Sequence, residues 1–179
     1  LFDGVELVSG SSPGDIIAGG AGGDGLYGRG GSDTLDGGAG NDIFDGGPGT
    51  AGDNDVFIGG TGTDHVNYAS RGAGVTVTMN DNFANDGAPF EGDNVGLDIE
   101  NLTGSLFTND SLTGNDSANV IDGQGGVDTF QGLGGNDTIR ARDGANDGAI
   151  NCGSGTDTLL ADLLNLDSNV TACETVTRS

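Results

Sequence analysis

The chain repeats a nine-residue phrase, of which residues 37–45, Gly-Gly-Ala-Gly-Asn-Asp-Ile-Phe-Asp, are the clearest copy. In each copy glycines come first, an aspartate stands sixth, and an apolar residue follows two places later. The sixth-position aspartates are Asp15, Asp24, Asp33, Asp42, Asp55, Asp64, Asp128 and Asp137. The matching apolar residues are Ile17, Leu26, Leu35, Phe44, Phe57, Val66, Phe130 and Ile139. A short fixed period of this kind predicts a stack of repeated coils.

The phrase itself predicts the fold class. A three-residue strand points its central apolar residue to one side and its two neighbours to the other. The glycines ahead of it supply the backbone conformations that a tight turn needs. Two phrases then make one coil, and successive coils stack as parallel strands in two facing sheets. We therefore expect an all-β protein, a parallel β-roll or β-solenoid.

The aspartate spacing predicts a cation in the turns. Equivalent aspartates of successive coils would lie about 4.8 Å apart, the interstrand distance. Two carboxylates at that distance repel by about 3 kcal/mol at an effective dielectric constant near 20. A hard divalent cation between coils removes this repulsion, and Ca²⁺ accepts carboxylate and carbonyl oxygens more readily than Mg²⁺ does. The sequence therefore predicts several Ca²⁺ ions, bound in the glycine-rich turns.

The hydrophobic core is expected to be thin, because each phrase sends one good apolar side chain inward. Ordering the backbone costs about 1–2 kcal/mol per residue, whereas burying one Leu or Phe contributes only about 1.5–3 kcal/mol. Metal binding must then supply much of the folding free energy. We expect the calcium-free chain to be largely unfolded or at best loosely collapsed.

The repeats divide the chain into five segments. These are a leading strand or cap (1–9), a first repeat block (10–67), a β-rich spacer (68–113), a second repeat block (114–160) and a C-terminal cap (161–179). An insertion around residues 50–53 should bulge outward. The spacer has strand signals at 75–79 and 98–102, and the acidic loop at 80–94 is either a further ion site or a plain polar loop.

The repeats resemble the RTX, or haemolysin-type, calcium-binding family, whose pattern is Gly-Gly-x-Gly-x-Asp-x-U-x with U apolar. The resemblance is carried by residues 19–67 and 123–140. Residues 65–70 and 99–104 are similar to a spacer between repeat blocks in secreted bacterial proteins. The Cys152 phrase and the Cys173-Glu174 ending are similar to tails from high-GC Gram-positive bacteria. The resemblance implies a secreted or cell-surface bacterial protein.

In that family the sixth-position aspartates and the turn carbonyls bind calcium. The resemblance implies that the ligands are Asp15, Asp24, Asp33, Asp42, Asp55, Asp64, Asp128, Asp137 and Asp157. The chain departs from the pattern where Arg29, Gln124 and Leu133 replace the second glycine, where Pro13 replaces the fourth, and where the uncharged Asn119 replaces an aspartate. Sites at Asp15 and Asn119 are accordingly less well supported.

The two cysteines, Cys152 and Cys173, are either a disulfide or two thiols. Their number is even, their separation closes a modest loop, and repeats of this sort belong outside the cell. We favour a disulfide that pins the C-terminal cap to the last coil.

Composition argues against several function classes. The net charge of −23, with five arginines and no lysine, makes nucleic acid and anionic membranes poor partners. No apolar run approaches the ~20 residues that span a bilayer. Ser12 stands in a Gly-x-Ser-x-Gly pentapeptide, but the strand–turn–helix context of a nucleophile is missing, and His65 is the chain's one histidine. We expect no enzyme.

Two non-enzymatic roles stay open. The chain is either an extracellular calcium-binding structural or cell-surface module, or a subunit that calcium cements into a filament or surface layer. A secretion and folding module cut from a larger enzyme or toxin is a variant of the first. Outward residues on one predicted sheet, Ile16, Ala18, Val56 and Ile58, are apolar. This face and the open solenoid ends would favour self-association.

Overall fold

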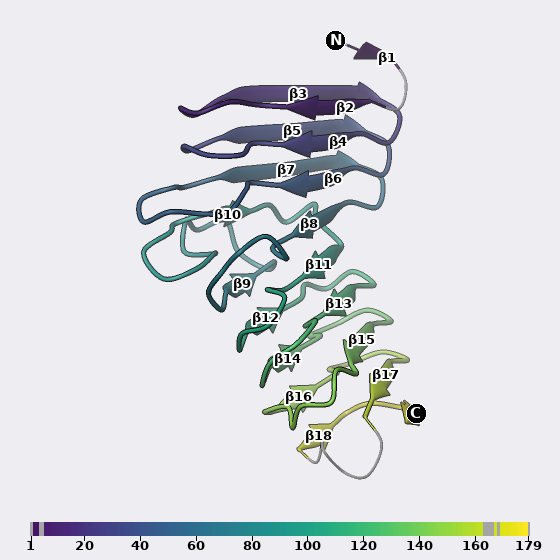
Figure 1. The fold of residues 1–179 in the computed structure, drawn as a ribbon. Coiled ribbons are helices and arrows are strands. Elements are labelled where there is room, and N and C mark those ends of the chain that lie inside the picture. The colour runs from purple at the N-terminus through teal and green to yellow at the C-terminus, as the bar shows by residue number, and fades with distance from the viewer. Residues whose placement is uncertain (1, 4–5, 163–166, 168, 179) are drawn as a thin grey trace.

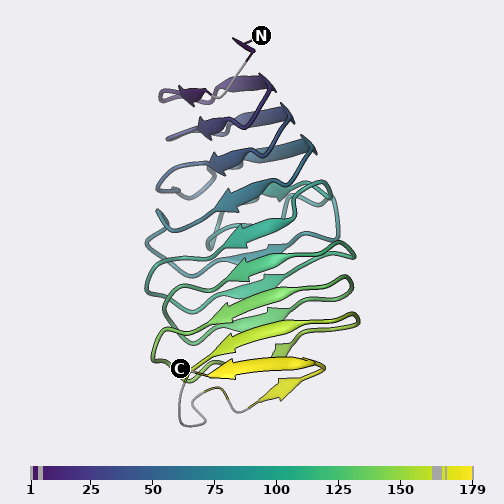
Figure 2. The same cartoon turned by 90° about the vertical axis from the view of Figure 1, so that its right-hand side faces the viewer.

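The computed structural model describes residues 2–3, 6–162, 167 and 169–178. These residues form one elongated stack of coils, with the two ends of the chain at opposite ends of the stack (Figures 1 and 2). The described part of the chain contains strands and turns but no helix, and therefore no helix that could cross a membrane. The expected all-β parallel solenoid is confirmed.

The strands form three parallel sheets, called here the first, long and third sheets. The first sheet holds β1 (Phe2–Asp3), β3 (Ile16–Ala21), β5 (Thr34–Ala39), β7 (Val56–Thr61) and β10 (Asn94–Val95). The long sheet holds β2 (Leu7–Ser9), β4 (Gly25–Tyr27), β6 (Ile43–Asp45), β8 (His65–Asn67), β11 (Asn101–Thr103), β13 (Val120–Asp122), β15 (Thr138–Ala141), β17 (Thr158–Ala161) and β19 (Thr175–Arg178). The third sheet holds β9 (Thr76–Thr78), β12 (Ser111–Thr113), β14 (Thr129–Gln131), β16 (Ile150–Asn151) and β18 (Val170–Thr171).

The register confirms that two phrases make one coil in the first repeat block. Leu26 pairs with Phe44 in the long sheet, and Ile17 pairs with Leu35 in the first sheet, each 18 residues away. The insertion lengthens the next coil, because Leu35 pairs with Phe57 across 22 residues. The inserted residues form a turn at Ala51 and Gly52 that is exposed, as expected.

The spacer exchanges one sheet for another. After β8 the chain forms β9, which begins the third sheet, and then returns to form β10, which pairs with β7 and completes the first sheet. The strand expected at 75–79 is β9. The strand expected at 98–102 lies later, at β11, because Asn101 pairs with His65 and the preceding residues Leu97 and Asp98 form a turn. Ile99 is nevertheless fully buried.

The core is a file of inward-facing side chains, one from the centre of most strands. It thickens where the first repeat block meets the spacer. The Phe44 and Phe57 ring centroids lie 6.1 Å apart, and those of Phe57 and Tyr68 lie 6.2 Å apart, both in edge-to-face contact. Tyr68 is 1% exposed. This aromatic cluster adds large apolar side chains in mutual contact to the core at the centre of the stack.

Three turns keep the left-handed backbone conformation even where the glycine is missing. Arg29, Gln124 and Leu133, which replace the second glycine of the phrase, have φ angles of 80°, 66° and 74°. A left-handed conformation costs a non-glycine residue about 1–2 kcal/mol. The packing of these three turns in the stack therefore offsets that cost.

The segment expected to be a C-terminal cap continues the coil in its described part. β18 pairs with β16, and β19 pairs with β17, both in parallel. Residues 163–166, 168 and 179 of this segment lie outside the described residues.

Candidate metal-binding turns

The sixth-position aspartates lie at the end of each glycine-rich turn, directly before a strand, and their side chains point into the stack. Asp33, Asp42 and Asp64 are at most 1% exposed. One carboxylate oxygen of each accepts a hydrogen bond from the main-chain N–H of the equivalent residue one coil earlier. The N–H of Asp24 donates to Asp42 Oδ1 at 2.7 Å, and the N–H of Asp42 donates to Asp64 Oδ1 at 2.8 Å.

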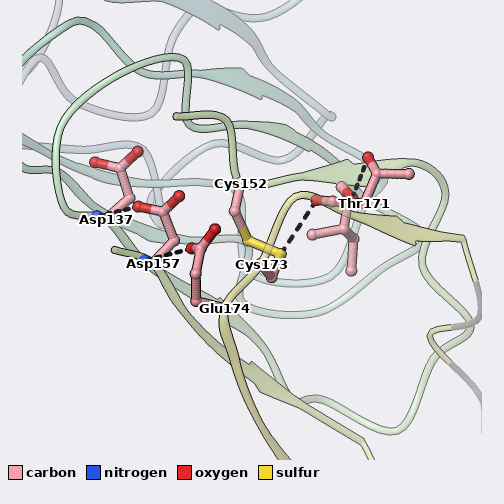
Figure 3. The surroundings of a disulfide bond; sticks show 7 residues. Asp137, Cys152, Asp157, Thr171, Cys173 and Glu174 are labelled. Carbon is pink, nitrogen blue, oxygen red and sulfur yellow. Dashed lines mark hydrogen bonds between the residues drawn. A yellow bond between two sulfur atoms is a disulfide. The ribbon is translucent and has the colours of Figure 1, made fainter. Parts of the chain in front are cut away.

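Repetition of this bond joins the side chains of successive coils into three columns, one beside each sheet, which are called here carboxylate ladders. Each residue of a ladder is called a rung. The first-sheet ladder is Asp15, Asp33, Asp55 and Asp93. The long-sheet ladder is Asp24, Asp42, Asp64 and Glu100, followed by Asn119, Asp137, Asp157 and Glu174. The third-sheet ladder is Asp110, Asp128, Asp147 and Asp167. Figure 3 shows the last rungs of the long-sheet ladder, from Asp137 through Asp157 to Glu174.

The ligand set expected from the sequence leaves out six of these rungs. They are Asp93, Glu100, Asp110, Asp147, Asp167 and Glu174. No complete glycine-rich phrase precedes them, so the nine-residue pattern gives no signal. For Asp110 a signal existed in its distance of 18 residues from Asp128, the length of one regular coil.

The second carboxylate oxygen is unsatisfied in most regular turns. Within the described part of the chain, buried Oδ2 atoms with no hydrogen-bond partner belong to Asp33, Asp42, Asp64, Asp137, Asp147 and Asp157. A buried acceptor without a partner costs about 1–3 kcal/mol, and a charged one costs more. The same unsatisfied atom in successive coils indicates a missing positive partner rather than an isolated packing fault.

Burial also makes these carboxylates poor acids in the absence of a cation. Burial, together with the charge of a neighbouring rung, raises the pKa of Asp64 and of Asp137 to about 6. Burial and the neighbouring aspartates likewise raise the pKa of Asp128 and of Asp147 to about 7. Main-chain N–H donors oppose the shift but do not cancel it.

The first glycine of each turn leaves room for an ion. A Cβ built on Gly19 would lie 2.5 Å from Asp24 Oδ2 and 2.6 Å from the carbonyl oxygen of Gly37, which belongs to the next coil. A Cβ on Gly37 would contact Asp42 Oδ2 in the same way. The space beside the first glycine of a turn is called here a glycine cradle. Each cradle is lined by a carboxylate oxygen of its own turn and, at Gly19, by a carbonyl of the adjacent coil.

These cradles fit calcium, whose preferred ligands are carboxylate and carbonyl oxygens. Among the described residues there is no group of three or more His, Cys, Asp or Glu side chains that could hold a metal. This is consistent with turns in which main-chain carbonyls supply part of the coordination. A bound ion would supply the positive charge that the unsatisfied oxygens lack.

All nine expected ligands lie in the ladders, although their calcium-binding role stays a prediction. Asp15 is the least favourable, because it ends its ladder, is half-exposed, and its Oδ2 already accepts the Ser11 N–H at 2.6 Å. Asn119 occupies a rung, as the repeat predicted, but its amide donates to the Glu100 carbonyl at 3.0 Å. Asp55 differs from the others because its Oδ2 pairs with Arg71 at 3.3 Å.

The acidic loop at 80–94 is built differently. Asp86 is buried and accepts hydrogen bonds from the N–H groups of Thr78 (2.7 Å) and Val95 (3.0 Å). Both of its oxygens are therefore engaged, although burial raises its pKa to about 7. Asp81 accepts the N–H of Phe83 in an exposed turn. Of this loop, only Asp93 joins a ladder.

The expected disulfide is present: Cys152 and Cys173 are bonded, with their Cα atoms 5.1 Å apart. Cys152 is fully buried, whereas Cys173 lies beside the strand β19 of the last coil (Figure 3). The bond ties the end of the chain to the last full repeat.

Comparison with protein families supports the same assignment of the turns. The profile described as the RTX calcium-binding nonapeptide repeat, in four copies, matches residues 9–44, 18–51, 27–66, 107–139 and 122–147. Together these matches cover more than half of the chain. Comparison with curated proteins finds no match.

Proposed function

Because the chain belongs to the RTX calcium-binding nonapeptide repeat family, we propose that it is an extracellular structural module that folds when it binds several Ca²⁺ ions. Calcium is scarce inside cells and plentiful outside, so such a chain would stay unfolded during export and fold afterwards. The proposed site residues are the ladder aspartates other than Asp55 and Asp93, whose second oxygens pair with Arg71, together with the turn carbonyls.

One observation carries the proposal. In both repeat blocks the buried Oδ2 atoms of successive rungs face glycine cradles and lack a partner among the described residues, as at Asp33, Asp42 and Asp137. If the acidic turns were only solvated surface loops, these oxygens would be exposed to water. Burying them in their ionised form is favourable only if a cation binds there.

The proposed role is non-enzymatic. His65 lies in β8, and its Nε2 is within hydrogen-bond distance of Thr103 Oγ1 at 2.8 Å. Burial lowers its pKa. Ser12 lies in the first turn of the stack, in repeat register. The serine and the histidine therefore lie in different coils, and each is part of the repeat structure.

Far-ultraviolet circular dichroism during a calcium titration tests the proposal. We expect little β signal in chelator, a cooperative rise with Ca²⁺, a much weaker response to Mg²⁺, and reversal by chelator. A full β signal in chelator that calcium does not change would contradict calcium-dependent folding.

A specific surface favours a second candidate, assembly into filaments. On the first sheet Ile16 is 87% exposed and Ala18, on the same strand, is also exposed, whereas Ile58, 39% exposed, lies two strands away with Asp36 between it and Ala18. On the end strand β2, Leu7 is 76% exposed.

Electron microscopy in calcium would show filaments if this face or the open end drives assembly. An Ile16→Thr/Ile58→Thr variant should then stay monomeric, and a monomeric wild type would exclude assembly.

A further inference from the structure

We propose that Arg71 takes the place of one calcium ion in the first-sheet ladder, so that Asp55 and Asp93 stack without a metal ion between them. The inference rests on the proposed function, since it concerns which rungs bind calcium. It predicts that a chain whose repeats need calcium contains one junction bridged by a side-chain cation of its own, where the first repeat block meets the spacer.

The guanidinium lies between two successive rungs. Arg71 Nη2 is 3.3 Å from Asp55 Oδ2 and 3.3 Å from Asp93 Oδ2. The two aspartates are otherwise ordinary rungs, because the N–H of Asp55 donates to Asp93 Oδ1 at 2.8 Å. A cation therefore bridges the second oxygens of adjacent coils here, whereas Asp33 Oδ2, one coil earlier, has no partner within the described residues.

The guanidinium also reaches the glycine cradle of that turn. Gly46 is the first glycine of the phrase that leads to Asp55, equivalent to Gly37 in the phrase of Asp42. A Cβ on Gly46 would contact Asp55 Oδ2 and would lie 3.3 Å from Arg71 Nη2. The space that a carboxylate and a carbonyl line in the regular turn thus holds a side-chain cation in this one.

The surrounding residues hold Arg71 in this position. Its side chain is 1% exposed, and its Nε donates to Glu91 Oε2 at 3.2 Å. The Tyr68 hydroxyl donates to Asp93 Oδ2 at 3.0 Å, and the Tyr68 ring centroid is 5.3 Å from the Arg71 Cζ atom. A planar guanidinium with several donors suits such a buried carboxylate cluster better than an ammonium would.

The charges explain why no ion is needed at this rung. A calcium ion placed beside a buried guanidinium would be repelled by it, and the two carboxylate oxygens that would bind the ion are already paired. An arginine stays protonated at any pH at which the protein is folded. The junction therefore keeps one positive charge between its carboxylates, independent of the calcium concentration.

Counting bound ions tests the proposal. Wild type, Arg71→Met and Arg140→Met are dialysed against saturating Ca²⁺, and bound calcium is measured by native mass spectrometry. We expect Arg71→Met to bind one ion more than wild type and to lose β signal in chelator. Arg140→Met is the matched control, because Arg140 is 52% exposed and pairs with Asp122 at 3.5 Å. Its ion count should equal that of wild type, as should that of Arg71→Lys.

Terbium luminescence locates the added ion. Tyr27 and Tyr68 are the chain's two tyrosines, and there is no tryptophan. In a Tyr27→Phe background, Tb³⁺ bound beside Asp93 would be excited through Tyr68. Luminescence per bound ion should therefore rise when Arg71→Met is added.

A third variant keeps the proposal testable if Arg71→Met folds poorly. Asp93→Asn in the wild-type background should bind as many ions as wild type, because its rung holds none. Loss of one ion from Asp93→Asn would overturn the proposal. So would an Arg71→Met chain that stays unfolded in saturating calcium or that folds with the wild-type ion count. Failure of the proposed function looks different, since wild type itself would then bind no calcium.

Discussion

At the scale of the single residue, a ladder aspartate such as Asp42 has two separate roles for its two oxygens. Oδ1 of Asp42 accepts the N–H of Asp24 and so fixes the stacking of two coils. Oδ2 of the same residue is buried and lacks a partner among the described residues. The first role belongs to the fold and the second to the ion, so a neutral amide should keep one and lose the other.

Asp42→Asn should therefore weaken calcium binding more than it disturbs stacking. The amide oxygen can still accept the Asp24 N–H, but the charged ligand is lost. An interaction with a charged group contributes about 1.5–3 kcal/mol, so we expect the calcium midpoint of folding to rise about tenfold or more. Asp116→Asn makes the same chemical change on an exposed turn and should leave the midpoint unchanged. Equal midpoints for the two variants would remove Asp42 from the ligand set.

Proton concentration should act in opposite directions with and without calcium. In the calcium-free fold, burial raises the pKa of Asp64 and Asp137 from 3.8 to about 6, and that of Asp128 and Asp147 to about 7. A raised carboxyl pKa stabilises the folded state below the unfolded pKa, and this contribution is lost as the pH rises through the folded pKa. In chelator, we therefore expect the β signal to be greatest in mild acid and to fall toward neutral pH.

With calcium the sign reverses, because protons compete with Ca²⁺ for the same oxygens. The calcium midpoint should rise as the pH falls below about 7. Parallel pH series of circular dichroism, one in chelator and one in saturating calcium, measure both trends. Two series with the same slope would show that these carboxylates do not couple folding to calcium.

At the scale of the element, the repeat determined what could be predicted. Wherever the full phrase occurs, strand, inward residue and coil length follow from the sequence, as the pairing of Leu26 with Phe44 shows. Where the phrase is lost, the position of a strand depends on its pairing with a strand that is distant in the sequence. β10 joins β7 across the spacer, and nothing local in Asn94–Val95 identifies that partner.

The residues of the candidate site likewise fall into those that the repeat predicts and those that it does not. The nine expected ligands all lie in ladders, but the rungs at Asp93, Asp147 and Glu100 depend on coils whose lengths vary, so no fixed spacing could find them. Arg71 was not predicted at all. Its position against Asp55 results from the turn after β8 folding back on the preceding coil, which a one-dimensional pattern does not contain.

At Gly40, as at several other turn glycines, the stack itself forbids a side chain. The φ angle of Gly40 is 134°, and a Cβ there would contact the carbonyl group of Gly22 in the preceding coil. Gly40→Ala should lower the stability of the calcium-bound form by at least about 1–3 kcal/mol from backbone strain alone. Gly72→Ala is the control, because a Cβ at Gly72 meets nothing within 4 Å. Urea denaturation in saturating calcium compares the two, and similar midpoints would contradict the close stacking of these turns.

At the scale of the whole molecule, the disulfide should matter most for the last coils. Cys152 and Cys173 are 21 residues apart, and closing such a loop stabilises the folded state by about 3 kcal/mol in the chain-entropy description. A Cys152→Ala/Cys173→Ala variant should unfold at lower urea concentration in calcium. Reductant should lower the stability of wild type and leave that of the variant unchanged. Equal stability of oxidised and reduced wild type would show that calcium alone holds this end.

The distribution of charge and packing along the stack predicts where order survives without calcium. Both repeat blocks combine a thin core with unpaired buried carboxylates, and each coil depends chiefly on its neighbours, so they should unfold cooperatively when the ions are removed. The junction at Arg71 combines two rungs bridged by a guanidinium with the aromatic cluster of Phe44, Phe57 and Tyr68. Hydrogen exchange in chelator should therefore retain protection in β6, β8 and β11 after it is lost from β3, β15 and β17.

Arg71→Met should abolish this residual protection, whereas Arg140→Met should preserve it. Uniform loss of protection along the wild-type chain would mean that one salt-bridged junction cannot offset the conformational entropy of the coils around it. Residual protection confined to the centre would instead mean that calcium extends an existing nucleus in both directions. The order of ion binding would then follow distance from Arg71, with the outermost coils folding last.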